Sequence, residues 1–232
     1  MQFAPIYPLL HKLLKPSFPD CLWEGSCAAK TVALTFDDGP HPNHTLPLLE
    51  VLAAYQVPAS FFWLGANVER FPDVARAVWQ QGYWLGLHGY HHDSFPFLSP
   101  QALQQSLQRT QTAIATACQI DPLEVQHRIR DVRPPNGLFT PQTLQLLNQW
   151  NYRPVMWSVV PEDWVRPGIK VATQRVLNQT QNGSLIVLHD GYCGGEDVAE
   201  TAAQIIPALL DQGYQFVTIE QFWQLRTRQC SG

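Results

Sequence analysis

From residue 30 onward, short apolar runs alternate with segments in which apolar residues recur every three or four positions. The runs predict strands and the spaced segments predict helices. The first pair is a strand over Thr31–Phe36 and a helix containing Leu48, Leu49, Leu52 and Tyr55. Further strands are predicted at Ala59–Leu64, Trp84–His88, Val132–Arg133, Val155–Val159, Leu185–Leu188 and Phe216–Val217.

Start and stop signals bound the intervening helices. Ser99 before Pro100 is typical of an N-cap followed by proline in the first turn, and Thr140–Pro141 also opens a helix. Gly82 and Gly213 end two others. The remaining helices are centred on Val74–Trp79, Val171–Leu177, Val198–Leu209 and Phe222–Trp223. This alternation predicts one α/β domain with mainly parallel strands, and the pattern alone leaves a barrel and an open sheet as alternatives.

Composition narrows the class of protein. A chain of 232 residues suits a single α/β barrel, and 45% hydrophobic with 15% charged residues indicates a well-packed body. The net charge of −4 gives no reason to expect nucleic acid as a partner. The cysteines form no CxxC pair and are expected as scattered thiols, with a Cys21–Cys27 bridge as the alternative in an oxidising compartment.

The N-terminal residues 1–29 form an extension whose pattern differs from the rest. Residues 3–14 are fairly apolar, but prolines and charged residues interrupt them, so no signal-peptide core is predicted. No stretch approaches the ~20 apolar residues that span a bilayer. We expect the extension to dock on the α/β domain of residues 30–228, with a membrane surface as the alternative. A cytoplasmic or membrane-peripheral location is therefore favoured.

Two adjacent carboxylates, Asp37 and Asp38, come where the first strand ends. Neighbouring side chains leaving a strand point in different directions, so one can bind a metal while the other takes a proton. A solvated Asp-Gly turn is the alternative. His41 and His44 follow closely; they either line the mouth of a site or are loop histidines.

Histidines follow the third strand. His88 and His92 are four residues apart, so one turn brings both rings together, and with one carboxylate they leave metal positions open for water. Surface histidines are the alternative. His91 is expected to face away.

Later strand ends supply further candidates. Arg133 can hold a carboxylate, and the prolines after it stiffen a loop that would present backbone N–H groups. Asp163, beside Trp164, could orient a histidine, and His189 could be a general acid or a packed residue. The carboxyl ends of parallel strands share one edge of the fold, where α/β proteins assemble active sites. We therefore expect these side chains to converge with those of the first and third strands.

Five motifs occur in order: TFDDG at 35–39, H-x-x-x-H at 88–92, R-x-P at 133–135, DW at 163–164 and LH at 188–189. With them the chain resembles the polysaccharide deacetylases, the NodB-homology domain of carbohydrate esterase family 4, from about Lys30 to Leu225. The resemblance implies a distorted (β/α) barrel with fewer than eight regular repeats, in keeping with the seven strands predicted. It also implies a metal-dependent hydrolase that removes acetyl groups from N-acetylated or O-acetylated sugars or polysaccharides.

Site roles follow from the resemblance, residue by residue. It implies a divalent metal, zinc above all with cobalt or nickel as substitutes, bound by Asp38, His88 and His92. Asp37 would be the base that activates metal-bound water. The other implied roles are Arg133 positioning Asp37, His189 as the acid tuned by Asp163, the backbone N–H of Asn136 stabilising the oxyanion, and Trp164 and Leu188 contacting substrate.

Three residues depart from the family pattern. Gly89 stands where the family usually has Ser or Thr, Asn136 replaces an aromatic residue, and Val187 replaces a leucine. The metal ligands and the base are retained. The departures bear on loop rigidity and on the walls of the sugar pocket, so peptidoglycan, chitooligosaccharide, acetylated xylan and a lipid-linked sugar all stay open as substrates.

Two other classes compete with this interpretation. Two histidines and one carboxylate also describe non-haem iron oxygenases, but those folds are typically all-β and have no use for a second aspartate. A non-catalytic, carbohydrate-binding descendant of the family is the other alternative, raised by Gly89 and Asn136.

Overall fold

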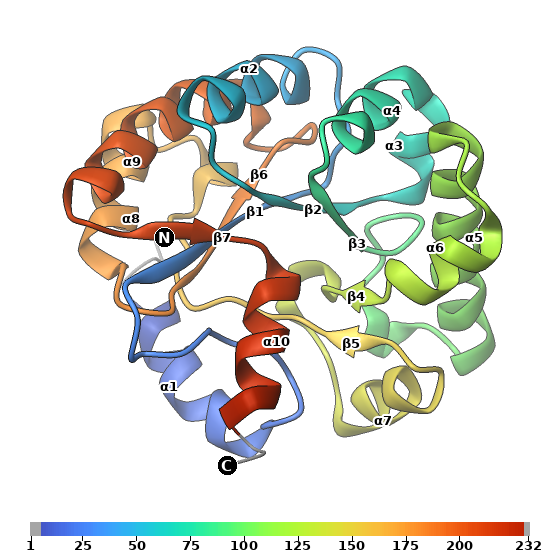
Figure 1. Ribbon diagram of the computed structural model, residues 1–232. Coiled ribbons are helices and arrows are strands. Elements are labelled where there is room, and N and C mark those ends of the chain that lie inside the picture. Colours follow the sequence, from blue (N-terminus) through green and yellow to red (C-terminus); the bar gives the residue numbers. More distant parts are fainter. Residues whose placement is uncertain (1–5, 230–232) are drawn as a thin grey trace.

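Parallel strands form a curled sheet at the centre of the molecule, and helices surround it (Figure 1). The structure, a computed structural model, describes residues 6–229. The strands are β1 (Thr31–Asp37), β2 (Ser60–Trp63), β3 (Trp84–Leu87), β4 (Asp131–Val132), β5 (Arg153–Pro154), β6 (Leu185–His189) and β7 (Gln215–Val217). Their order is β5-β4-β3-β2-β1-β6, and β7 also pairs with β1. The distorted (β/α) barrel expected from the sequence is thus confirmed.

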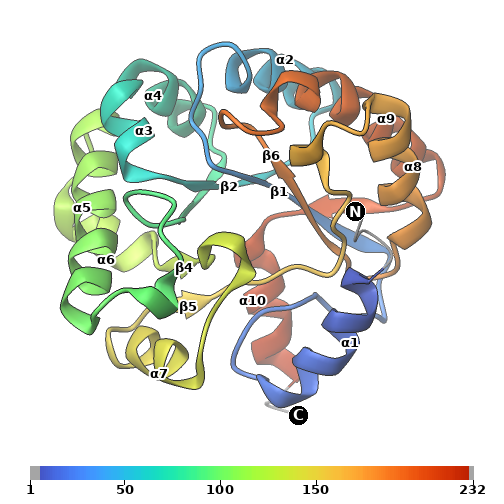
Figure 2. The ribbon, with the colours of Figure 1, turned by 180° about the vertical axis from the view of Figure 1, so that it is seen from behind.

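Apart from the first helix, which precedes β1, the helices follow strands along the chain, and they surround the sheet (Figure 2). They are α1 (Tyr7–Ser17), α2 (Thr45–Tyr55), α3 (Gly65–Arg70), α4 (Pro72–Gln80), α5 (Pro100–Cys118), α6 (Pro122–Arg128), α7 (Pro141–Gln149), α8 (Ile169–Gln179), α9 (Val198–Asp211) and α10 (Ile219–Gln229). Ser99 caps α5 by accepting from Ala102, and Thr140 caps α7 by accepting from Thr143, as their sequence signals predict.

The register of the sheet places the carboxyl ends of β1 and β6, which carry polar residues, side by side. β1 pairs with β6 so that Asp37 lies opposite His189, and on its other side Asp37 lies opposite Phe62 of β2. A fully buried core between sheet and helices holds this alignment; it includes Phe36, Phe61 and Leu188. The strand ends therefore present their side chains on one edge of a packed barrel.

The predicted strand over Val155–Val159 was wrong, because β5 covers only Arg153–Pro154 and ends before it. Past Pro154 the chain changes partners, because Val155 forms an isolated bridge with Leu22 and Val159 forms one with Ile186. β4 likewise ends at Val132, although the Arg133 N–H still donates to Leu87 O at 2.9 Å. The helices α1, α3 and α6 were not predicted, since their short or proline-interrupted patterns carry little periodicity.

Residues 21–25 of the N-terminal extension lie at the seam between β5 and β6. Leu22 N donates to Pro154 O at 2.9 Å, and Met156 N donates back to Leu22 O at 2.8 Å. On the other side Gly25 N donates to Gly183 O at 2.8 Å. The extension thus continues the main-chain bonding of the barrel where β5 is too short to do so. Among residues 6–229, no helix is both long and apolar enough to cross a membrane.

Candidate active site

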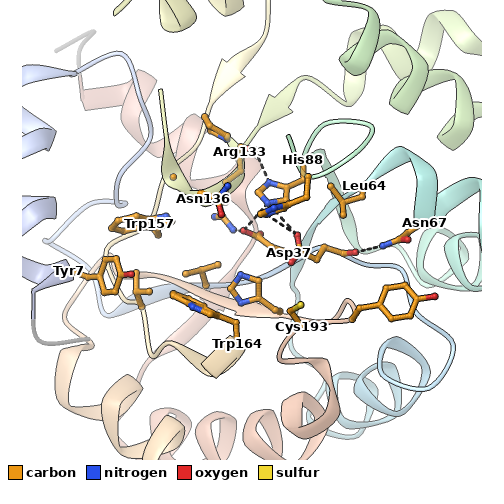
Figure 3. Close-up of a pocket in the computed structure, with 18 residues that line it drawn as sticks. Tyr7, Asp37, Leu64, Asn67, His88, Arg133, Asn136, Trp157, Trp164 and Cys193 are labelled. Carbon is orange, nitrogen blue, oxygen red and sulfur yellow. Dashed lines mark hydrogen bonds and ion pairs between the residues drawn. The ribbon is translucent and has the colours of Figure 1, made fainter. Parts of the chain in front are cut away.

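A pocket of about 600 Å³ opens where the strands end (Figure 3). β1, β3 and β6 bring polar side chains to it, and the loops after β4 and β5 complete its walls. Most of the predicted site residues line it: Asp37, Asp38, His88, His92, Arg133, Asn136, Trp164 and His189. The structure therefore brings together residues that are far apart in sequence.

Asp37 is held by a buried arginine. Arg133 Nη1 donates to Asp37 Oδ1 at 2.5 Å and to Thr35 Oγ1 at 2.8 Å, while Nη2 donates to Met156 O at 2.9 Å. The guanidinium carbon lies 4.1 Å from the centre of the Phe62 ring. Arg133 reaches Asp37 through one nitrogen only, so the carboxylate keeps Oδ2 for other chemistry. Three further contacts, with Thr35, Met156 and Phe62, fix the guanidinium that holds it.

Asp38, His88 and His92 form a group that fits a divalent metal. Asp38 Oδ1 lies 3.5 Å from the Nε2 atoms of both histidines, and one ligand atom from each residue falls within 4.8 Å of the others. Asp38 Oδ1 is buried and has no hydrogen-bond donor. An orphaned carboxylate oxygen facing two imidazole nitrogens is the donor set that zinc-type ions take.

His88 is prepared as a neutral ligand. Its Nδ1 lies 2.7 Å from Arg133 O, an acceptor, so Nδ1 carries the proton, and the lone pair of Nε2, on the side of Asp38, is free for a metal. Burial lowers the pKa of His88, against the charges of Asp37 and Asp38 that raise it. The neutral imidazole is therefore favoured, as ligation requires.

His189 is bound to Asp163 at two points. Asp163 Oδ2 accepts from the His189 backbone N–H at 2.7 Å, and Oδ1 pairs with Nδ1 at 2.9 Å. Asp163 lies behind the histidine and does not line the pocket, which leaves Nε2 of His189 as the nitrogen directed at a substrate. Trp164 stands against the same imidazole, edge to face, with ring centres 5.1 Å apart.

The backbone at Asp38 adopts a left-handed conformation, with φ of 72°. Asn67 supports it, because its Nδ2 donates to Asp38 O at 2.7 Å. Gly39 follows at a close approach, since a Cβ there would lie 2.4 Å from Asp190 Oδ2. Asp190 is fully buried and accepts from Thr45 Oγ1 at 2.6 Å. These contacts aim Asp37 and Asp38 in different directions, as the sequence predicts for adjacent carboxylates.

Burial and the nearby charges of Asp38 and Asp37 raise the pKa of Asp190 to about 7, although its hydrogen bond from Thr45 opposes the rise. Asn67 and Asp190 were both missed by sequence reasoning. Asp190 directly follows His189 at a strand end and could have been found there, whereas no signal in the sequence marks Asn67.

Leu188 does not reach the pocket, contrary to expectation. It belongs to the main core, and its neighbour Val187 lines the pocket instead. Successive side chains of a strand alternate between faces, so Val187 shares the face of His189 and Leu188 points the other way.

The other histidines lie outside the pocket lining. His91 is exposed and packs on Tyr90, with ring centres 4.7 Å apart. His41 and His44 stack on each other at 4.1 Å, and His44 Nδ1 lies 2.7 Å from Gly191 O. These contacts suit loop histidines, as one of the two interpretations held.

Gly89 has a φ of 85°, a conformation that side chains rarely adopt. It lies between the two metal-ligand candidates, His88 and His92, and a Cβ there would lie 3.0 Å from His91 O. Glycine therefore suits the local backbone, and the departure from the family pattern at this position has a conformational reason.

Comparisons with known proteins point to one family. A family model described as polysaccharide deacetylase matches residues 24–155. A chitooligosaccharide deacetylase of Rhizobium leguminosarum bv. trifolii is 32% identical over 204 residues, which are 83% of this chain and 91% of the relative.

Two solved structures share the fold. A peptidoglycan N-acetylglucosamine deacetylase, solved in complex with a benzamide ligand, superposes with a TM-score of 0.82 at 27% identity, covering 88% of this chain and 93% of that one. A carbohydrate esterase family 4 pseudoenzyme from Bacillus anthracis gives a TM-score of 0.77 at 26% identity, covering 86% of this chain and 67% of that one.

Proposed function

Because this chain belongs to the polysaccharide deacetylase family, we propose that its pocket hydrolyses the acetamide of an N-acetylated sugar, with Asp37 as general base and His189 as general acid. The observation that carries the proposal is the convergence of three units on one pocket. They are the Asp38–His88–His92 group, the Asp37–Arg133 pair and the His189–Asp163 pair.

Asp37 would take a proton from the attacking water. Its Oδ1 is committed to Arg133, whereas Oδ2 lies 4.0 Å from His88 Nε2 and so faces the metal-ligand group. As water adds to the acetyl carbonyl, its proton passes to this oxygen. Arg133 keeps the carboxylate in place throughout, which is how a positioned base lowers the barrier.

Asp38, His88 and His92 would hold the metal, and we propose zinc, with cobalt or nickel as substitutes. When bound, a divalent ion supplies Lewis acidity, which polarises a carbonyl group and makes water a better nucleophile near neutral pH. The loop carrying Asn136 lines the same pocket, and its backbone N–H would donate to the oxyanion. Val187 would contact the acetyl methyl group.

His189 would protonate the nitrogen that leaves. The amide nitrogen of a tetrahedral adduct is a poor leaving group until it gains a proton, and Nε2 of His189 is the nitrogen turned to the pocket. The C–N bond then breaks, releasing acetate and a sugar with a free amine. Trp164, packed on His189, would contact the substrate beside the reacting group.

The test measures acetate released by metal-loaded protein from chitooligosaccharides, peptidoglycan fragments and acetylated xylan. Asp37→Asn should keep the metal and lose about 10²–10⁴-fold in rate, the usual contribution of a general base. Asp211→Asn, an exposed aspartate at the end of α9, is the matched control and should behave as wild type. Wild-type turnover in Asp37→Asn would exclude the base role.

A non-catalytic role is the second candidate, because one structural neighbour is a pseudoenzyme. The same assay separates the two. Glycan binding by metal-loaded wild type without acetate release from any substrate would establish a binding protein. Retention of Asp37, Asp38, His88 and His92 in one pocket favours catalysis.

A further inference from the structure

Helix α1 brings an aromatic side chain into the pocket from outside the segment that the family model matches. Tyr7, its first residue, lines the pocket together with Trp157 and Trp164. Its ring meets Trp157 edge to face at 5.4 Å and Trp164 at 6.2 Å, and Figure 3 shows it turned toward both. The three rings come from the N-terminal extension and from the segment after β5.

The position of Tyr7 is fixed by the packing of α1. His11 pairs with Glu24 at 3.1 Å and meets Trp23 edge to face, and Lys15 forms an ion pair with Glu24. Further along, Phe18 packs on Phe139 with ring centres 5.0 Å apart. The helix is thus attached along its length to the body, and Tyr7 is presented by a fixed element.

Trp164 lies between Tyr7 and His189. The ring centres of Trp164 and of His189, the proposed acid, lie 5.1 Å apart in an edge-to-face arrangement, and those of Trp164 and Tyr7 lie 6.2 Å apart. Tyr7 is therefore separated from His189 by a single ring, that of Trp164. Tyr192 also lines the pocket, but its ring packs on His41 and Phe71, so Tyr7, Trp157 and Trp164 form a separate cluster of rings in the pocket wall.

A pyranose ring matches such a surface, because its C–H faces are apolar while its hydroxyls point outward to polar groups. We propose that Tyr7 is a specificity-determining residue, which with Trp157 and Trp164 binds the sugar ring adjacent to the one being deacetylated. The proposal rests on the proposed function.

The test compares Tyr7→Ala, Tyr7→Phe and, as control, Leu13→Ala, which removes an exposed side chain from the same helix. Substrates are N-acetylglucosamine oligomers of increasing length and a small activated acetate ester. Tyr7→Ala should raise KM for the longer oligomers about tenfold with kcat unchanged, the effect of one lost aromatic contact. Ester hydrolysis should not change. Tyr7→Phe keeps the ring and should match wild type, as should Leu13→Ala.

A binding arm uses unreactive glucosamine oligomers, with Kd from calorimetry. Tyr7→Ala should weaken binding by the same factor. This measurement tests the role of Tyr7 even if the wild-type protein releases no acetate. The absence of acetate release would refute the proposed function but not the role of Tyr7. Equal Kd and KM in Tyr7→Ala and Leu13→Ala would overturn the proposal. An equal loss for oligomer and ester would overturn it too, since that pattern means Tyr7 only maintains the shape of the site.

Discussion

Asp163 decides the charge of His189 through direct contact. Burial lowers the pKa of this imidazole, but the charge and hydrogen bond of Asp163, with further contributions from Asp38 and Asp37, raise it to about 10. A proton is therefore held on His189 through neutral pH, which suits a residue that must donate it to an amine. The same contacts fix the ring, because Asp163 also accepts from the backbone N–H.

From this geometry we predict that removing the His189 side chain lowers the rate of amide hydrolysis more than the rate of ester hydrolysis. His189→Ala should abolish hydrolysis of N-acetylglucosamine oligomers but retain part of the hydrolysis of an activated acetate ester, whose alkoxide leaves without a proton. Asp163→Asn should act in the same direction, less severely. Rates for both substrates in wild type and both variants measure the amide-to-ester ratio.

The pH profile gives a second readout of the same pair. An acid must be protonated, so the amide rate falls as pH rises above its pKa. Asp163→Asn removes the largest influence that raises the pKa of His189, so the alkaline limb of kcat/KM should move to lower pH. An unmoved limb, or an equal loss for amide and ester in His189→Ala, would show that His189 is a packing residue.

Much of the site was predictable from where polar residues fall. Asp37, His88, Arg133 and His189 end or follow predicted strands, and parallel strands share one edge. The position of Val187 in the pocket could also have been predicted, since its side chain lies on the same strand face as His189. Tyr7 was not, because its place depends on how α1 packs, which no periodicity in the sequence specifies.

The N-terminal segment acts as part of the barrel. Trp23 is almost fully buried in a cluster with Cys21, Leu144 and Met156, and its Nε1 donates to Phe18 O at 3.0 Å. Its ring also meets Trp157, edge to face, at 6.3 Å. α10 lies beside α1 in both views, and Arg226 donates to Cys21 O at 3.0 Å (Figures 1 and 2).

We therefore predict that Trp23→Ala lowers the free energy of unfolding by about 3–5 kcal/mol, as expected for a large aromatic side chain lost from a core. Leu13→Ala on α1 is the control; its side chain is 70% exposed, so the change should stay within about 0.5 kcal/mol. Urea unfolding followed by circular dichroism measures both. A loss below about 1 kcal/mol in Trp23→Ala would mean that the segment adds little to the barrel.

Elements with strong periodicity or clear caps were predictable, and those set by tertiary pairing were not. The capped helices α5 and α7 begin where Ser99 and Thr140 predict. The prediction of a strand over Val155–Val159 was wrong because Val155 pairs with Leu22 and Val159 pairs with Ile186, so no continuous ladder forms. Pairing between distant segments therefore determines where these strands end, and it cannot be predicted from the local sequence.

Across the whole molecule, the metal-ligand group joins two parts of the barrel. Asp38 follows β1, whereas His88 and His92 belong to the loop after β3. The negative charges of Asp37 and Asp38 lie close enough to Asp190 and to the buried imidazole of His88 to raise the pKa of Asp190 and to oppose the fall in the pKa of His88. A cation in this position would offset their repulsion and tie the two strand ends together, so occupancy should be coupled to the stability of the entire domain.

We predict that chelation lowers the Tm of the full chain and that added zinc restores it. Binding at a hundred times Kd contributes about 2.7 kcal/mol, which corresponds to roughly 5–10 °C for a domain of this size. Scanning calorimetry measures the shift, and cobalt and nickel arms rank the ions. Asp38→Asn should lose both the response and the bound metal, whereas Asp211→Asn, on the outer helix α9, should keep both. The loss should be specific to the metal-ligand group, because Asp211 carries the same charge but does not line the pocket. An identical Tm with and without chelator, together with full metal content in Asp38→Asn, would refute a metal at these three residues.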